Sequence, residues 1–489
     1  MKISSITKCL LFAAVFISSN LFAQIDKNKD EFTKEFESFK NKTQKKFDDF
    51  KKKNDSVFVQ FLEDSWYSFD LIYNEKPKIP KPVSQPVIKH SEKIDLKITP
   101  IKKTGAIKTT PGEKLIEKSG IIKNLENFKI NAENKTNINF YGRKLDLYYN
   151  KNIPLITVIN GDNITAFYRE ASSNHNLIKT VLLLKMTADE YKFNDWGFLK
   201  ILQTAAAGLY SNINDKVLFT WFALLQNGYN VKTAYNNDNV YLLIPSDQEI
   251  FNTSYFTIAG HKYYVANFKD NTERVKSLIA HKADYPGNSY SFSLLMEKIP
   301  DLENNVTIRE FSFLNKSFTI SQNKNLIKFF GDYPDCALEV YFHTPLSKNT
   351  LIGFDSFFNQ KFNNKNELWK INYLMDFVQH SLVYLRDEEQ FGQENYLFAE
   401  ESLYYSGADC EDRAVLLARL IKHYVGLQTI GLNFPEHVSL AVNLANPIKG
   451  VYLTHNEKKY YISDPTYIGA KCGMLMPELR NEYPEIIEY

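Results

Sequence analysis

The chain has 489 residues, of which 44% are hydrophobic and 24% are charged, and its formal net charge is +2 at pH 7. This length and apolar content leave room for two or three globular domains and exclude a chain that is mostly disordered. The small net charge gives no reason to expect nucleic acid as a partner.

The first 23 residues have the pattern of a secretory signal peptide. Lys2 and Lys8 accompany the apolar run CLLFAAVFI at 9–17, and SSNLFA then leads to a cleavage position after Ala23. The run is too short for a transmembrane helix, and no later segment is long and apolar enough to be one. The sequence therefore predicts an exported protein, periplasmic or extracellular. Association with the envelope is possible, and the oligomeric state stays open.

Two segments of different composition follow the signal. Residues 24–75 have the spacing of an amphipathic helix, because phenylalanines from Phe32 to Phe50 recur at intervals near three and four. This helix would pack on its own domain or, alternatively, bind a partner. In 76–112, prolines alternate with lysines, which favours extended polyproline conformation. We interpret this segment as a solvated linker, with contact to an acidic envelope surface as the alternative.

The remaining chain has the alternating strand and helix patterns of an α+β protein. Residues 113–291 form one α+β domain, 300–350 a strand-rich connecting segment, and 351–489 a C-terminal domain. The patterns predict strands at 137–150, 240–244 and 262–268, helices at 194–210, 215–225 and 365–385, and alternation again from 307 to 343.

Three residues with complementary chemistry occur in the C-terminal domain. Cys410 stands at the predicted start of a helix that Asp409 can cap, where the helix dipole favours a thiolate. His437 precedes the strand-like run VSLAVNL, and Asp464 follows the strand-like run YYIS. A nucleophile on a helix, with a base and a carboxylate on adjacent strands, is the arrangement of a cysteine triad for acyl transfer. Taken singly, each residue also has a structural explanation, as a buried cysteine, a core histidine or a turn aspartate.

These residues and their neighbours resemble the transglutaminase-like branch of the papain-like cysteine superfamily. The matching motifs are D-C-E-D-R at 409–413, H-V at 437–438 and D-P-T at 464–466, within a region of about 366–467. The resemblance implies a triad of Cys410, His437 and Asp464 that acts on peptide or protein substrates by hydrolysis or cross-linking. Two positions depart from the family pattern, namely Ala408, where glycine is usual, and Ser439, where an aromatic residue is frequent.

Further expectations concern the oxyanion hole, metals and the other cysteines. The family places a side-chain donor upstream of the nucleophile, and Gln379 is the candidate, with an ordinary surface glutamine as the alternative. We expect no cofactor and no metal, because the sequence has no metal-ligand motif or calcium-binding loop. Cleavage of the signal leaves Cys336, Cys410 and Cys472, an odd number that points to one free thiol, while Cys336 and Cys472 could pair. The competing hypothesis is a non-catalytic envelope protein that binds peptide or cell-wall material in the same cleft.

The first α+β domain repeats the pattern of the second. Aligning INDKVLFTWF with CEDRAVLLAR places Ile213 against Cys410 and Asp215 against Asp412. The strands that follow place Asn239 against His437 and Asn267 against Asp464. Isoleucine and asparagine supply neither a nucleophile nor a base, so the first domain would be an inactive, degenerate copy. The alternative is that any helix followed by two strands would align in this way.

Overall fold

The computed structural model describes residues 57–63, 66–78, 80–88, 134–149, 152–266, 274–281 and 288–489. The chain divides into two units, Met1–Asp64 and Ser65–Tyr489. In the first unit, residues 57–62 are helical and the rings of Phe58 and Phe61 are stacked 5.7 Å apart. The predicted signal peptide and the predicted helix up to residue 56 lie outside the described residues. No helix in the described ranges has the length and apolar character needed to cross a membrane.

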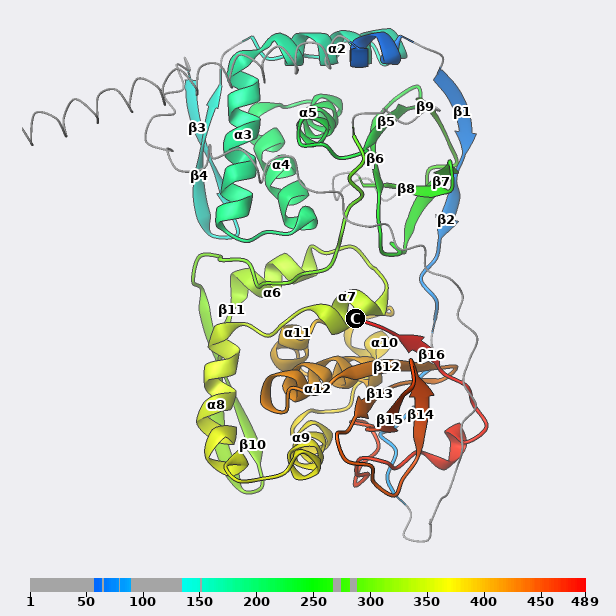
Figure 1. The fold of residues 1–489 in the computed structure, drawn as a ribbon. Coiled ribbons are helices and arrows are strands. Elements are labelled where there is room, and N and C mark those ends of the chain that lie inside the picture. Colours follow the sequence, from blue (N-terminus) through cyan, green and yellow to red (C-terminus); the bar gives the residue numbers. More distant parts are fainter. Residues whose placement is uncertain are drawn as a thin grey trace, which may run out of the picture. The chain divides into compact units, whose positions relative to one another are not determined.

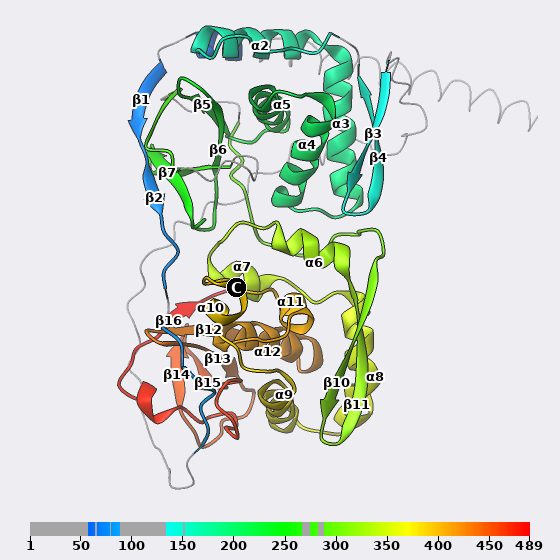
Figure 2. The same ribbon diagram turned by 180° about the vertical axis from the view of Figure 1, so that it is seen from behind.

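The second unit is a mixture of α and β structure in two lobes, as the sequence predicts at that level (Figures 1 and 2). The N-terminal lobe has a hairpin, four helices and a seven-stranded antiparallel sheet of order β1-β9-β5-β6-β8-β7-β2. Its elements are β1 (Trp66–Asp70), β2 (Ile72–Asn74), β3 (Asn134–Phe140), β4 (Arg143–Tyr149), α2 (Gly161–Ser173), α3 (His175–Glu190), α4 (Asp195–Leu209), α5 (Ile213–Gln226), β5 (Lys232–Tyr235), β6 (Val240–Pro245), β7 (Thr253–Ile258), β8 (His261–Val265) and β9 (Ser277–His281).

The C-terminal lobe has a hairpin, seven α-helices and a five-stranded antiparallel sheet of order β14-β15-β13-β12-β16. Its elements are β10 (Val306–Phe313), β11 (Lys316–Asn323), α6 (Lys324–Gly331), α7 (Leu338–His343), α8 (Lys348–Phe362), α9 (Glu367–Ser381), α10 (Asp387–Phe391), α11 (Ala399–Tyr404), α12 (Cys410–Tyr424), β12 (Thr429–Phe434), β13 (His437–Asn443), β14 (Tyr452–His455), β15 (Lys458–Ile462), η4 (Pro477–Leu479) and β16 (Glu485–Ile487).

Asparagine side chains fix the start of six helices across both lobes. At each N-cap the asparagine side chain accepts a hydrogen bond from a backbone N–H of the first turn, which has no partner within the helix. These caps are Asn160, Asn174, Asn194, Asn212, Asn323 and Asn366. The helices then bury apolar residues at helical spacing, and α5 and α12 are almost wholly buried against their sheets.

The two lobes share one strand order. Read from β9, the N-terminal sheet runs β9-β5-β6-β8-β7, and the C-terminal sheet runs β16-β12-β13-β15-β14, with each strand in the same place along the chain. The central register also corresponds: Leu243 pairs with Val265, and Ala441 pairs with Ile462. In each lobe the long buried helix that precedes these five strands in the chain, α5 or α12, packs against the middle strand of the five, β6 or β13. The strands expected to begin near Asn239 and to end near Asn267 therefore do pair, although Asn267 itself lies outside the described residues.

Three expectations are corrected by these elements. The helical pattern predicted up to residue 75 is wrong for 66–74, where β1 and β2 pair with β9 and β7 at the two edges of the sheet. The alternation at 324–343 does not form strands, because α6 and α7 bury its apolar residues at helical spacing. The hairpin β10–β11, predicted to be a connecting segment, packs on α8 and α9 and so belongs to the C-terminal lobe.

The predicted solvated linker is also corrected where the structure describes it. Lys76 is 5% exposed and the Lys81 side chain 1% exposed, and both form ion pairs with the C-terminal lobe. Val87 forms a parallel bridge with Ile468. Residues 80–88, which we call the strap, therefore dock on the lobe. Residues 89–112 lie outside the described ranges.

Candidate active site

Cys410 is the first residue of α12, as predicted, and Asp409 is the N-cap residue. The apolar residues of α12 pack against β13, which fixes the start of the helix beside the start of that strand. His437 is the first residue of β13, and Asp464 follows the end of β15. The structure thus places the three predicted residues at neighbouring element ends, and all three are buried.

The histidine and the aspartate form the expected pair. His437 Nε2 lies 2.8 Å from Asp464 Oδ2. The other oxygen, Asp464 Oδ1, accepts hydrogen bonds from the backbone N–H groups of Thr466 and Tyr467, which hold the carboxylate in place. Within the described part of the chain, His437 Nδ1 has no hydrogen-bond partner although it is buried. That nitrogen is the group that could accept a proton.

The Cys410 thiol contacts the residue next to the histidine but donates its hydrogen bond to a carboxylate, not to the imidazole. Sγ accepts a hydrogen bond of 3.5 Å from the backbone N–H of Val438, the residue after His437. The thiol itself donates to Glu411 Oε2 at 3.1 Å. Burial raises the pKa of Cys410 well above its usual value, and the carboxylates of Glu411 and Asp409 raise it further. The hydrogen bond to Glu411 and the raised pKa both favour the thiol, in contrast to the thiolate expected at a helix start.

A buried lysine from the strap lies among the carboxylates around Cys410. Lys81 Nζ is 2.7 Å from Asp409 Oδ2, 3.0 Å from a carboxylate oxygen of Asp387 and of Glu394, and in contact with Glu411 Oε1. Burial raises the pKa of Asp387 to about 6 and that of Glu394 to about 7. Burial also opposes ionisation of Glu411, but the attraction of Lys81 leaves its pKa below the usual value. Groups of these acids lie close enough together to bind a cation, and Lys81 supplies that positive charge.

Gln379 does not fit its predicted role in the oxyanion hole. Its Nε2 donates to the backbone carbonyls of Asp464 and Ala470, at 3.1 and 3.2 Å, and its Oε1 accepts from the N–H of Gly469 at 3.1 Å. Both amide hydrogens are therefore used within a buried network, so neither is left for an oxyanion. Gln379 instead ties α9 to the loop that carries Asp464, and it is not the surface glutamine of the alternative either, since it is 1% exposed.

Arg413, the last residue of the D-C-E-D-R motif, ties α9 to the start of α12. Its guanidinium is fully buried and donates to the carbonyls of Val378, Gln379, Leu382 and Ala408. Burial lowers its pKa to about 10. Neither Arg413 nor Lys81 was expected from the sequence to have a role of its own. The available signal was the concentration of acids in D-C-E-D at the start of an apolar helix, which calls for compensating charge.

The other cysteines take no part in this arrangement. Cys336 and Cys472 are free thiols and both are buried, so they do not form the disulfide that the sequence left open. Burial raises the pKa of Cys472 to about 11 and that of Cys336 further. Cys472 lies near Ser463, the residue before Asp464, whereas Cys410 is the cysteine that accepts a hydrogen bond from the residue after His437.

The corresponding positions of the N-terminal lobe retain part of the geometry without the chemistry. Asp215 Oδ1 accepts from the N–H of Ile156 at 2.7 Å, as Asp412 Oδ1 accepts from that of Leu397 at 2.9 Å. The N–H of Val240 donates to Asn214 Oδ1 at 2.8 Å, in the place where that of Val438 meets Cys410. Asn239 is in the place of His437, so this lobe has no nucleophile or base at the corresponding positions.

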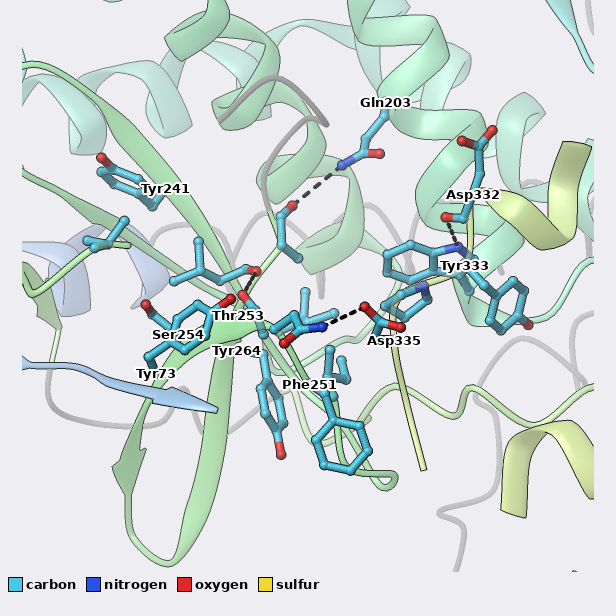
Figure 3. Close-up of a pocket in the computed structure, with 18 of the residues that line it drawn as sticks. Tyr73, Gln203, Tyr241, Phe251, Thr253, Ser254, Tyr264, Asp332, Tyr333 and Asp335 are labelled. Atoms are coloured by element: carbon cyan, nitrogen blue, oxygen red, sulfur yellow. Dashed lines mark hydrogen bonds between the residues drawn. The ribbon is translucent and has the colours of Figure 1, made fainter. Parts of the chain in front are cut away.

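A separate cavity of about 320 Å³ lies beside β6, β7 and β8 (Figure 3). Aromatic rings that include Tyr73, Phe251 and Tyr264 surround it together with Asp335, which accepts a hydrogen bond from Asn252 at 2.9 Å. None of its lining residues belongs to the triad or to the strap. The cavity is lined by neither a cysteine nor a histidine.

Comparisons with known proteins found no match: no family model, no curated protein and no solved structure is similar to this chain.

Proposed function

We propose that the protein is an exported, transglutaminase-like cysteine enzyme that transfers acyl groups at amide bonds of peptides or proteins. The observation that carries the proposal is the His437–Asp464 pair at 2.8 Å, with the thiol of Cys410 hydrogen-bonded to the residue after that histidine. The motif resemblance, the order of helix and strands, and the place of Cys410 at a helix start support the same chemistry.

The proposed reaction begins with transfer of the Cys410 proton to His437 Nδ1. The thiolate then attacks the amide carbonyl, and the imidazolium returns the proton to the leaving amine as the C–N bond breaks. This leaves a thioester on Cys410. Water resolves it to a carboxylate in hydrolysis, or a primary amine resolves it to a new amide in cross-linking. Asp464 keeps the ring oriented throughout.

One observation favours the competing function of a binding protein without catalysis. Cys410 is fully buried and donates its proton to Glu411 rather than to His437, so the described state is not poised for attack. Such a protein would hold peptide or cell-wall material beside an unreactive thiol.

The test uses the full chain, labelled casein and a fluorescent primary amine. The proposal predicts either release of soluble peptides or incorporation of the amine, and a covalent acyl adduct on Cys410 detected by mass spectrometry. Cys410→Ala should abolish both, whereas Cys472→Ala should retain them. A wild-type Cys410 that is no more reactive than an exposed model thiol towards a thiol probe would support the binding function instead.

A further inference from the structure

We infer that Lys81, which lies 330 residues upstream of Glu411, is a positioning residue of the proposed active site. It holds the Glu411 side chain and balances the negative charge around the Cys410 thiol. The inference rests on the proposed cysteine chemistry and names a component that the triad motifs do not contain.

The first argument is the arrangement of charge. In the described part of the chain, Lys81 is the ion-pair partner of all four carboxylates of the cluster, Asp387, Glu394, Asp409 and Glu411. Its side chain is 1% exposed, so water does not screen these interactions. Glu411 bridges the lysine and the thiol, because one oxygen contacts Nζ and the other accepts from Sγ.

The second argument is that the strap is built to deliver this lysine. Tyr384 Oη donates to the carbonyl of Pro82 at 2.7 Å, and Gln85 Nε2 donates to that of Gln379 at 3.1 Å. Further on, Ile468 N–H donates to the Pro86 carbonyl at 2.8 Å, and Ile88 N–H donates to the Ile468 carbonyl at 3.1 Å. The strap is thus held both at α9 with the residues just after it and at the loop that follows Asp464. Prolines on either side of Lys81 restrict its backbone, so little freedom is lost when it docks.

The third argument is chemical. Buried carboxylates next to a thiol oppose its ionisation, and a buried ammonium among them offsets that opposition. The groups that face Cys410 are Asp409, Glu411 and Arg413 on its own helix, Tyr384 after α9, His437 on β13 and Lys81 on the strap. With Lys81 in place, the proton can leave Sγ for His437 Nδ1 and give a thiolate and an imidazolium. Without Lys81, the negative charge of the cluster would hold the proton on sulfur.

The experiment measures alkylation of Cys410 by iodoacetamide in the full chain between pH 5 and 10, read at the Cys410 peptide by mass spectrometry. Lys81→Gln should move the midpoint of the profile upward by at least about one pH unit, which lowers the rate at neutral pH about tenfold. Lys81→Arg keeps the charge and should stay close to wild type. Lys76→Gln is the control: it removes an ion pair with Asp335 just before the strap and a hydrogen bond to the Glu394 backbone carbonyl, but none of the carboxylate contacts of Lys81, and it should not move the midpoint.

Two outcomes would overturn the inference. One is a folded Lys81→Gln protein whose profile overlies that of wild type. The other is faster alkylation at every pH, which would make the strap a cover over the site. Should Lys81→Gln fail to fold, Asp387→Asn provides the test, because it removes one carboxylate and keeps Lys81. The midpoint of the alkylation profile should then fall. A midpoint that stays or rises contradicts the inference. An unreactive wild-type thiol would refute the proposed enzyme, whereas the difference between the variants tests Lys81.

Discussion

The two lobes share the order of five strands in their sheets. They differ at the first turn of the buried helix that packs on those strands, α5 in one lobe and α12 in the other. In both, an aspartate of that turn accepts a hydrogen bond from a buried backbone N–H, and an N–H at the start of β6 or β13, that of Val240 or Val438, donates to the first turn of the helix. The N-terminal lobe fills this turn with Asn214 and a half-buried Lys216. The C-terminal lobe fills it with Cys410, Glu411 and the fully buried Arg413.

This difference shows which features belong to the scaffold and which to the chemistry. Both lobes have the five-strand order, its central register and the aspartate contact, although only one lobe has a nucleophile. Packing and hydrogen bonding are therefore sufficient to explain these features. The buried carboxylates and their cationic partners occur where the thiol is, and burying such charges is costly unless they are paired. An internal duplication in which one copy lost its chemistry, as we propose, accounts for both the likeness and the difference.

The largest expected effect comes from removing the nucleophile. Cys410→Ala should reduce amide hydrolysis or amine incorporation to background, because it removes the thiol that would form the thioester. Asn214→Ala, at the corresponding turn of the other lobe, should leave the rate unchanged. The measurement is turnover of labelled casein, with circular dichroism to verify folding. Activity that persists in Cys410→Ala would remove the chemical distinction between the lobes.

Asp464→Asn tests the orientation of the base. Loss of the carboxylate leaves His437 without its charged partner, and we expect kcat/KM to fall by about 10²–10⁴-fold, the range for general acid–base contributions. Asn is of similar size and can still accept the N–H of Thr466, so the fold should persist. A pH profile of kcat/KM identical to that of wild type would show that the pair is only structural.

Arg413 and Lys216 offer a comparison of stability at matching helix positions. Arg413→Met leaves several buried carbonyls without a donor, and we expect a loss on the order of 3 kcal/mol. Lys216→Met should change stability by less than about 0.5 kcal/mol, as is usual away from buried networks. Urea unfolding of the two variants measures the difference. Equal losses would contradict the structural role given to Arg413.

The buried acids of the C-terminal lobe predict a stability that falls as pH rises. Burial raises the pKa of Glu401 to about 8, so the folded state keeps a proton that the unfolded chain releases near pH 4. Its contribution is fully present below that lower value and is lost as pH rises to about 8, with a slope of at most about 1.4 kcal/mol per pH unit. Glu401→Gln should flatten the dependence of the urea midpoint between pH 5 and 8. Asp215→Asn in the other lobe should flatten it less, because burial raises the pKa of Asp215 less strongly than that of Glu401.

The smallest expected effect concerns the scaffold of the N-terminal lobe. Asn214→Ala removes the hydrogen bond to the N–H of Val240 and should cost about 1 kcal/mol of unfolding free energy. The matched change Asn212→Ala removes a helix cap in the same turn, with a cost of similar size. No change in thermal unfolding for Asn214→Ala would show that the contact shared by the lobes does not stabilise the sheet.

Local pattern was sufficient to predict the elements that carry the triad. The apolar spacing of α12 and the alternation of β13 and β15 are visible in sequence, so Cys410, His437 and Asp464 could be placed at element ends. Long-range contacts were not visible. The proline and lysine content of 76–112 predicted a solvated linker, because no local feature shows that Lys81 binds acids more than 300 residues away. Gln379 was misassigned for the same reason: its partners lie 85 to 91 residues further on.

The segment from β1 to the strap has a consequence for how the protein is made. Trp66 pairs with His281, Ile72 with Tyr255, and Lys81 with Glu411, so this early segment waits for partners synthesised much later. At about 5–20 residues per second, the ribosome needs on the order of tens of seconds to reach Glu411 after Lys81. The two strands have no native partners until the chain passes His281, and Lys81 has none until Asp387 to Glu411 are made. The carboxylate cluster around Cys410 is therefore neutralised only when the early strap meets residues made some 300 positions later.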